Sequence, residues 1–218
     1  MTMQYYTTKQ LKELLRDDKV TLVDTRSRNE FTDGFIPGAV FIGQDGKMAE
    51  WAAEMLAPDT SLVLVTGAGR EEEVADILRN KGFTHILGVL DGGFEHWKNE
   101  GETIDMIINV HADELAMDIP FDENLLVLDV RKPMEYAEGH VKNARNLPLS
   151  DMRDTINIAG LEEDQNIYIH CASGYRSVIA ASILKQHGFN NIRNVTGGWE
   201  SISHTRGIET EKEKSALN

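Results

Sequence analysis

Cysteine is almost missing from this chain: Cys171 is the only one among 218 residues. An internal disulfide is therefore excluded, and a lone thiol fits a reducing compartment better than an oxidising one. Long apolar runs are missing too, since none approaches the roughly 18 residues of a membrane span. The N-terminal residues MTMQYYTTKQ lack the apolar core of a signal peptide. We expect a soluble, cytoplasmic protein.

Basic residues are in short supply, with 22 Lys and Arg against 36 Asp and Glu and a net charge of −14. Nucleic acids and anionic membranes attract clustered Lys and Arg, so we expect no nucleic-acid and no membrane partner. The seven histidines are scattered singly, without the HxHxDH type of metal cluster, and we expect no metal and no cofactor. The 41% of hydrophobic residues supports packed cores, and the length suits two small domains.

Cys171 lies within residues 167–177, which read IYIHCASGYRS. Residues 167–170 are a short apolar run typical of a buried strand, and the apolar residues from 178 onward fall at helical spacing. We therefore expect Cys171 on a tight loop between the carboxyl end of a strand and a helix, where open α/β sheets bind ligands. The helix dipole and the charge of Arg176 favour a reactive thiolate there. A buried structural cysteine is the alternative, although the flanking residues are small, polar and cationic.

The chain repeats itself at an offset of about 105 residues. EFTDGFIPGAVFIG at 30–43 is matched by EYAEGHVKNARNLPL at 135–149, and DTR at 24–26 by DVR at 129–131. This self-similarity indicates duplicated domains, and strands alternating with helices predict an α/β fold. Each copy should hold a mainly parallel central sheet with helices on both faces. We predict domains at 1–103 and 104–205, followed by a polar, frayed tail at 206–218.

The DVR segment with a downstream EGH, the CxxGxRS loop before a helix and a closing GGW together resemble the rhodanese homology domain. The resemblance covers nearly the whole chain, twice. It implies a sulfurtransferase that carries a sulfane sulfur on Cys171 as a persulfide. The expected substrates are small sulfur-containing anions such as thiosulfate, or low-molecular-weight persulfides and polysulfides.

Small side chains allow the loop backbone to curl around one sulfur atom, with its N–H groups stabilising the negative charge. The predicted substrate-binding residues are Ala172, Ser173, Gly174, Tyr175, Arg176 and Ser177. Gly174 should supply a φ angle that other residues resist. Arg176 either holds a leaving oxyanion or braces the loop, and Ser177 either bonds the sulfur or starts the helix. Asp129 and Arg131, at the end of a strand, are predicted to be structural supports, as is Glu135.

The first copy differs from the second at the loop that corresponds to the cysteine loop. Residues 66–70 read TGAGR, one residue shorter than CASGYR, and Thr66 takes the place of the cysteine. A hydroxyl ionises far less readily than a thiol, so we expect this domain to be catalytically silent. Arg70 keeps the place of Arg176, where it either binds an anion or, as we favour, is a solvated residue at a helix start.

Residues 34–56, GFIPGAVFIGQDGKMAEWAAEML, carry a narrower resemblance. They are similar to the silent rhodanese-like domain of fusion proteins that begin with a metallo-β-lactamase-fold persulfide dioxygenase. The resemblance implies such a dioxygenase as a partner, and the chain as either a stand-alone tandem protein or a piece of a longer fusion. Because the protein is acidic and its loop offers one cation, we expect glutathione persulfide to be preferred over thiosulfate as sulfur donor.

Two other functions remain open at this stage. A cysteine-based phosphatase or arsenate reductase would use a similar loop, but with one more residue between cysteine and arginine to surround a tetrahedral oxyanion. The six residues from Cys171 to Arg176 suit a single sulfur atom better. A non-enzymatic binding module is the second alternative, and the retained cysteine argues against it only for the second domain.

Overall fold

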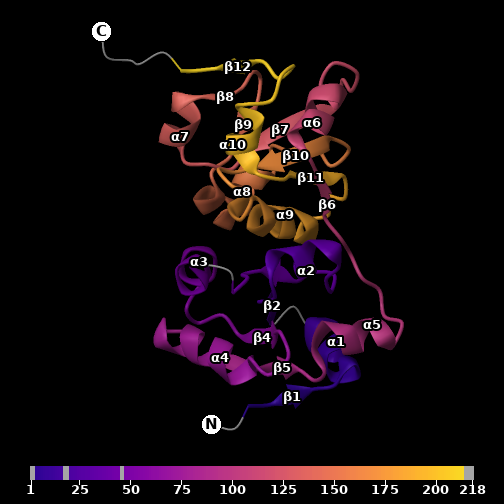
Figure 1. Cartoon of the computed structure of the whole chain (residues 1–218). Coiled ribbons are helices and arrows are strands. Elements are labelled where there is room, and N and C mark those ends of the chain that lie inside the picture. The colour runs from indigo at the N-terminus through magenta and orange to yellow at the C-terminus, as the bar shows by residue number, and fades with distance from the viewer. Residues whose placement is uncertain (1–2, 17–19, 45–46, 214–218) are drawn as a thin grey trace. The chain divides into compact units, whose positions relative to one another are not determined.

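The structure is a computed structural model that describes residues 3–16, 20–44 and 47–213, with its elements labelled in Figure 1. The chain forms two compact units, Met1–Met106 and Ile107–Asn218. Their division lies close to the boundary predicted after residue 103.

The first unit is built on a five-stranded parallel sheet in the order β1-β5-β4-β2-β3. Its strands are β1 (Tyr5–Tyr6), β2 (Thr21–Asp24), β3 (Val40–Phe41), β4 (Leu62–Val65) and β5 (Ile86–Leu90). Its helices are α1 (Thr8–Arg16), α2 (Arg28–Asp33), α3 (Met48–Met55), α4 (Glu71–Asn80) and α5 (Gly93–Asn99). The central strand β4 reads LVLV and is buried throughout, as expected for a parallel strand covered on both faces.

The second unit repeats this plan with the sheet order β6-β11-β10-β7-β9, again with parallel neighbours. Its strands are β6 (Ile108–Val110), β7 (Leu125–Asp129), β8 (His140–Val141), β9 (Arg145–Asn146), β10 (Asn166–His170), β11 (Ile192–Val195) and β12 (Thr210–Glu211). Its helices are α6 (Ala112–Asp118), α7 (Pro133–Glu138), the 3-10 helix η1 (Leu149–Arg153), α8 (Thr155–Ile158), α9 (Arg176–Gln186) and α10 (Gly198–Ile202). Taken in chain order, the two five-stranded sheets have the same topology, so the α/β fold predicted for both copies is confirmed.

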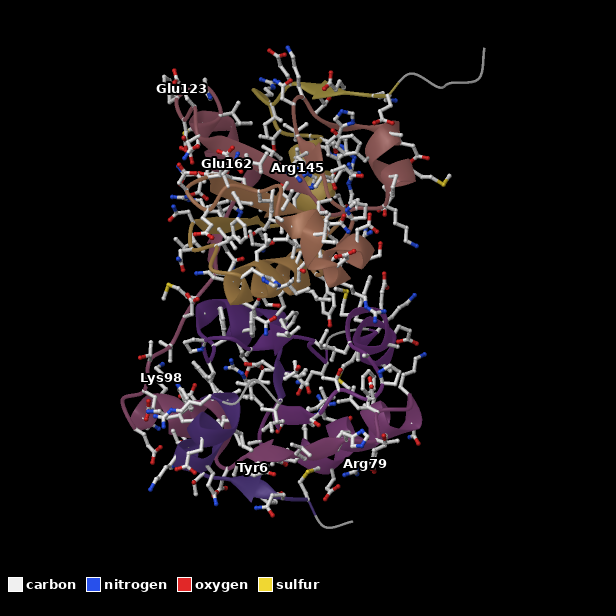
Figure 2. All side chains as sticks on the ribbon, turned by 180° about the vertical axis from the view of Figure 1, so that it is seen from behind. Tyr6, Arg79, Lys98, Glu123, Arg145 and Glu162 are labelled. Atoms are coloured by element: carbon white, nitrogen blue, oxygen red, sulfur yellow. The ribbon has the colours of Figure 1, made fainter. Side chains whose placement is uncertain are left out.

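Helices cover both faces of the second sheet. Figure 1 shows α9 on one side and α6 and α10 on the other. On the α6 side, Leu115 and Ile202 belong to one buried cluster with Val127 and Tyr168 of the sheet. Removing this apolar surface from water stabilises the unit by roughly 25 cal/mol per Å² buried. Figure 2 shows side chains filling the space between strands and helices in each unit.

The tail is ordered as far as the structure describes it, so the expectation of fraying is wrong for residues 206–213. Strand β12 pairs antiparallel with β8, and the N–H of Lys142 donates to the carbonyl of Glu209 at 2.9 Å. Polar side chains do not reveal such a strand, because its pairing is made by backbone groups. Residues 214–218 of the predicted tail lie outside the described residues.

Candidate active site

The second unit places Cys171 where the sequence predicted it. The cysteine follows the last residue of the central strand β10, and α9 begins five residues later at Arg176. The neighbouring strand β7 ends beside it, since His170 is in register with Asp129. The side chain of Cys171 is buried, with 1% exposed. Only a small group that enters the loop can therefore reach its sulfur.

The loop directs an N–H group at this sulfur. The backbone N–H of Gly174 donates to Sγ of Cys171 at 3.1 Å. Gly174 has a φ of 96°, in the left-handed region that favours glycine, which confirms the conformation predicted for it. An N–H aimed at sulfur stabilises negative charge on a thiolate or on a persulfide.

The start of α10 fixes the orientation of the loop. The N–H of Trp199 donates to the carbonyl of Cys171 at 2.7 Å, and that of Glu200 to the carbonyl of Ala172 at 3.2 Å. In a trans peptide the C=O and the following N–H point in opposite directions. Carbonyls held by α10 therefore turn the next N–H groups of the loop away from α10. The closing GGW segment therefore holds the loop as well as starting α10, and its paired glycines are the signal for this role in the sequence.

Arg176 forms a two-point ion pair that the sequence did not reveal. Its Nη1 and Nη2 atoms each lie 2.7 Å from an oxygen of Glu135 on α7. The hydrogen bonds from Arg176 lower the pKa of Glu135 to about 2. The same pairing, together with the nearby Cys171 side chain, raises the pKa of Arg176. Of the two roles considered for Arg176, this geometry favours bracing the loop.

Ser177, included among the predicted substrate-binding residues, starts the helix instead of facing the sulfur with its hydroxyl. It is the second residue of α9 and is fully buried. Its hydroxyl donates to Oδ1 of Asn194 at 2.7 Å, and the amide of Asn194 donates to Oδ1 of Asn109 at 2.8 Å. A hydroxyl has one proton to donate, and here Asn194 accepts it. These polar side chains tie α9 to β11 and β6.

Asp129 and Arg131 form a buried clamp beneath the loop. Arg131 donates through Nη2 to Asp129 at 2.6 Å and to the carbonyl of Gly139 at 2.6 Å. Its guanidinium lies 4.5 Å from the ring centre of Trp199. A carboxylate and a guanidinium that satisfy each other in this way hold neighbouring segments together. The contacts therefore fit the structural role expected for both residues.

The first unit contains the same clamp. Arg26 donates through Nη2 to Asp24 at 2.6 Å and to the carbonyl of Gly34 at 2.8 Å, and it lies 4.0 Å from the ring centre of Phe94. The clamp is therefore a feature that the two units share.

The loop of the first unit is arranged differently. The N–H of Gly69, three residues after Thr66, donates to a carboxylate oxygen of Glu71 at 3.2 Å. Arg70 pairs with Glu73 on its own helix at 2.6 Å. A carboxylate thus takes the N–H that corresponds to the sulfur-facing N–H of Gly174. This geometry argues against anion binding by Arg70.

His170 is a buried polar residue that the sequence analysis missed. It is fully buried, its Nδ1 lies 3.2 Å from the carbonyl oxygen of Cys171, and its Nε2 has no hydrogen-bond partner. Burial lowers the pKa of His170, against the opposing charge of Asp129. The corresponding residue of the first unit is Val65 at the end of β4.

Residues 3–16, 20–44 and 47–213 lack two other kinds of feature. In these ranges no three His, Cys, Asp or Glu side chains are grouped so that they could hold a metal ion. No helix within the same ranges is long and apolar enough to cross a membrane.

Both units thus have a loop between a parallel strand and a helix, and this loop carries a cysteine in the second unit and a threonine in the first. The family model described as "Rhodanese-like domain" matches this chain twice, at residues 7–100 and at residues 111–205. The chain therefore belongs to the rhodanese-like family and contains two of its domains.

Individual proteins of this family are similar to parts of the chain. A putative sulfur carrier protein YrkF of Bacillus subtilis is 34% identical over 106 residues, which cover 49% of this chain and 55% of that protein. A thiosulfate sulfurtransferase GlpE of Pseudomonas putida is 34% identical over 97 residues, covering 44% of this chain and 86% of that protein. The crystal structure of a rhodanese-related protein from Thermoplasma volcanium is 35% identical, covers 49% of this chain and 99% of that one, and superposes with a TM-score of 0.43. The chain thus spans about half the length of the Bacillus relative.

Proposed function

We propose that this protein is a rhodanese-type sulfurtransferase whose second unit carries a sulfane sulfur on Cys171. The thiolate attacks the outer sulfur of a donor R–S–S⁻ or of thiosulfate. A bond forms between Sγ and that sulfur while the donor's S–S bond breaks. The products are Cys171–S–S⁻ and the leaving group R–S⁻ or sulfite, which takes the bonding electron pair. A second nucleophile then removes the sulfur and restores the thiolate.

The observation that carries this proposal is the hydrogen bond from Gly174 N–H to Sγ of Cys171. It supports a loop whose backbone N–H stabilises charge on a sulfur atom at residue 171. Such preorganised donors contribute roughly 2.7–4 kcal/mol each to transition-state stabilisation. The ring of six residues is small for a tetrahedral oxyanion, which weighs against a phosphatase or arsenate reductase. The family comparisons, whose named relatives include sulfurtransferases, do not favour that alternative.

The proposed donors are low-molecular-weight persulfides, with glutathione persulfide preferred over thiosulfate. The net charge of −14 opposes the approach of a dianion. The exposed side chain of Met134 on α7 offers apolar contact to an organic donor. A metallo-β-lactamase-fold persulfide dioxygenase is the proposed metabolic partner, because it consumes the same class of substrate. A reducing, cytoplasmic setting would keep Cys171 as a thiol.

Mass spectrometry of the intact protein tests the proposal. After incubation with thiosulfate, glutathione persulfide or polysulfide, the wild type should gain the mass of one sulfur atom, and cyanide should remove it. Cys171→Ser should gain nothing and should transfer no sulfur, because no other thiol exists. Undiminished turnover by the serine variant would refute the assignment of the nucleophile. The first unit contributes no transfer in this scheme.

A further inference from the structure

The geometry points to Glu135 as the residue that sets donor specificity: it engages Arg176 and so disfavours donors that release an oxyanion, such as thiosulfate. This inference rests on the proposed function and concerns the same loop. It assigns to Glu135, interpreted from the sequence as structural, an influence on which sulfur compound is used.

The contact is a matched pair that leaves little of the guanidinium for another anion. Two nitrogens of Arg176 face the two oxygens of Glu135, each at 2.7 Å. The side chain of Arg176 is 16% exposed, and that of Glu135 is 35% exposed. Glu135 is itself held in place, because its Oε2 accepts the N–H of Lys132 at 3.1 Å. A fork-to-fork pair of this kind is the geometry in which arginine binds oxyanions.

Arg176 is also the cation at the end of the cysteine loop, five residues after Cys171. The charge of Cys171 and a hydrogen bond with its side chain contribute to the raised pKa of Arg176. The guanidinium is paired with Glu135 and belongs to the residue that ends the cysteine loop. The paired carboxylate offsets the positive charge that the leaving group of a donor would otherwise meet.

The first unit holds the corresponding carboxylate and arginine in other contacts. Glu30 occupies the corresponding place on α2, but its carboxylate accepts the N–H of Ser27 at 3.0 Å and the hydroxyl of the same residue. Arg70, in the shorter loop, pairs with Glu73. The carboxylate and the arginine are thus present in both units: Glu30 binds Ser27 and Arg70 binds Glu73 in the first, whereas Glu135 and Arg176 bind each other in the second.

The pairing of Glu135 with Arg176 affects the two donors differently because their leaving groups differ. Thiosulfate releases sulfite, whose negative charge grows on oxygens next to the breaking bond and needs a cation close by. Glutathione persulfide releases a thiolate, and its carboxylates lie on an organic stem away from the reacting sulfurs. Offsetting the charge of Arg176 therefore penalises thiosulfate more than it penalises the persulfide.

The test compares Glu135→Gln with the wild type, using both donors and one common acceptor. Glutamine keeps the shape of the side chain and can still accept the N–H of Lys132, but it removes the charge that faces Arg176. The ratio of kcat/KM for thiosulfate to kcat/KM for glutathione persulfide should rise by about fivefold or more. A ratio that does not rise, or two efficiencies that fall in parallel, would overturn the inference and leave Glu135 as a structural brace.

Matched variants make the result specific. Glu138→Gln removes the same charge from an exposed position on the same helix, and it should leave the ratio within about twofold of the wild type. In an Arg176→Gln background, Glu135→Gln should no longer change the ratio, and a change of the same size there would also overturn the inference. Should Glu135→Gln fail to fold, Glu135→Ala, which also removes the charge, should raise the ratio in its place, and an unchanged ratio would refute the inference.

The intact mass distinguishes failure of the proposed function from failure of the specificity inference. If neither donor adds a sulfur atom to the wild type, the proposed function fails. If the wild type gains a sulfur atom but Glu135→Gln leaves the ratio of the two kcat/KM values unchanged, the specificity inference alone fails.

Discussion

Gly198 and Cys171 lie so close together that a β-carbon on Gly198 would stand 2.3 Å from the carbonyl oxygen of Cys171. The backbone of Gly198 also has a φ of 57°, which a side chain would strain. The close approach allows the neighbouring N–H of Trp199 to hold that carbonyl at 2.7 Å. In the first unit the corresponding distance, from Gly93 to the carbonyl oxygen of Thr66, is 3.3 Å. The cysteine loop of the second unit is therefore seated more tightly on its helix than the corresponding loop of the first unit.

Gly198→Ala should therefore displace the loop and lower kcat by about 10–100-fold, because small misplacements at a reacting centre cost that much. The control is Gly188→Ala, where φ is 88° and a β-carbon would meet nothing within 4 Å. Both variants should lose about 1–2 kcal/mol of stability from backbone strain. Turnover should fall only in the first, and equal turnover in the two would show that the seating of the loop is unimportant.

Glutathione persulfide should exceed thiosulfate in kcat/KM by at least about tenfold, which needs only ~1.4 kcal/mol of differential transition-state binding. The reason is the ion pair of Arg176 with Glu135 in an acidic protein. Both donors should be measured at one pH with one acceptor, at low and at moderate salt. Equal or better efficiency with thiosulfate at both salt concentrations would contradict the preference.

Thr66→Cys should not create a second sulfur-carrying loop. The N–H of Gly69 donates to Glu71 rather than toward residue 66, and the loop is one residue short. The variant is best made together with Cys171→Ser, so that residue 66 holds the only thiol. Intact mass after persulfide treatment should then show no labile sulfur. A sulfur that cyanide can remove would mean that neither loop length nor Glu71 silences the domain.

Acid should destabilise the wild type through His170. Burial lowers its folded-state pKa below the ordinary 6.5, so the unfolded chain binds its proton first as the pH falls. Stability is therefore lost from about pH 6.5 down to the folded-state pKa, by up to ~1.4 kcal/mol per pH unit. The lowered pKa of Glu135 acts the same way, but only below its ordinary 4.5.

His170→Val, which introduces the residue found at position 65 of the first unit, should remove that pH dependence. Thermal unfolding measured at about pH 7.5 and pH 5.5 should show a smaller loss of Tm in the variant than in the wild type. His187→Gln, at an exposed position, is the control and should behave like the wild type. An identical acid response in His170→Val and the wild type would assign the effect to other groups.

Local patterns in the sequence predicted the general plan of the molecule. The alternation of apolar runs with helical spacing indicated parallel α/β domains, and the offset between copies indicated a duplication. The position of Cys171 after a buried strand, and the unusual backbone of Gly174, also followed from neighbours in the chain. These features depend on backbone geometry and burial over a few residues, which periodicity and turn chemistry report directly.

The tertiary structure decided which distant side chains meet. Arg176 finds Glu135 across 41 positions, and Ser177 finds Asn194 across 17. Strand β12 joins β8 although its residues read as a polar tail. No local pattern specifies such partners, because a charged or polar side chain has many possible partners in one sequence. Which of them it meets depends on how helices and strands pack on the sheet, and a loop shorter by one residue leaves Arg70 paired with Glu73 instead.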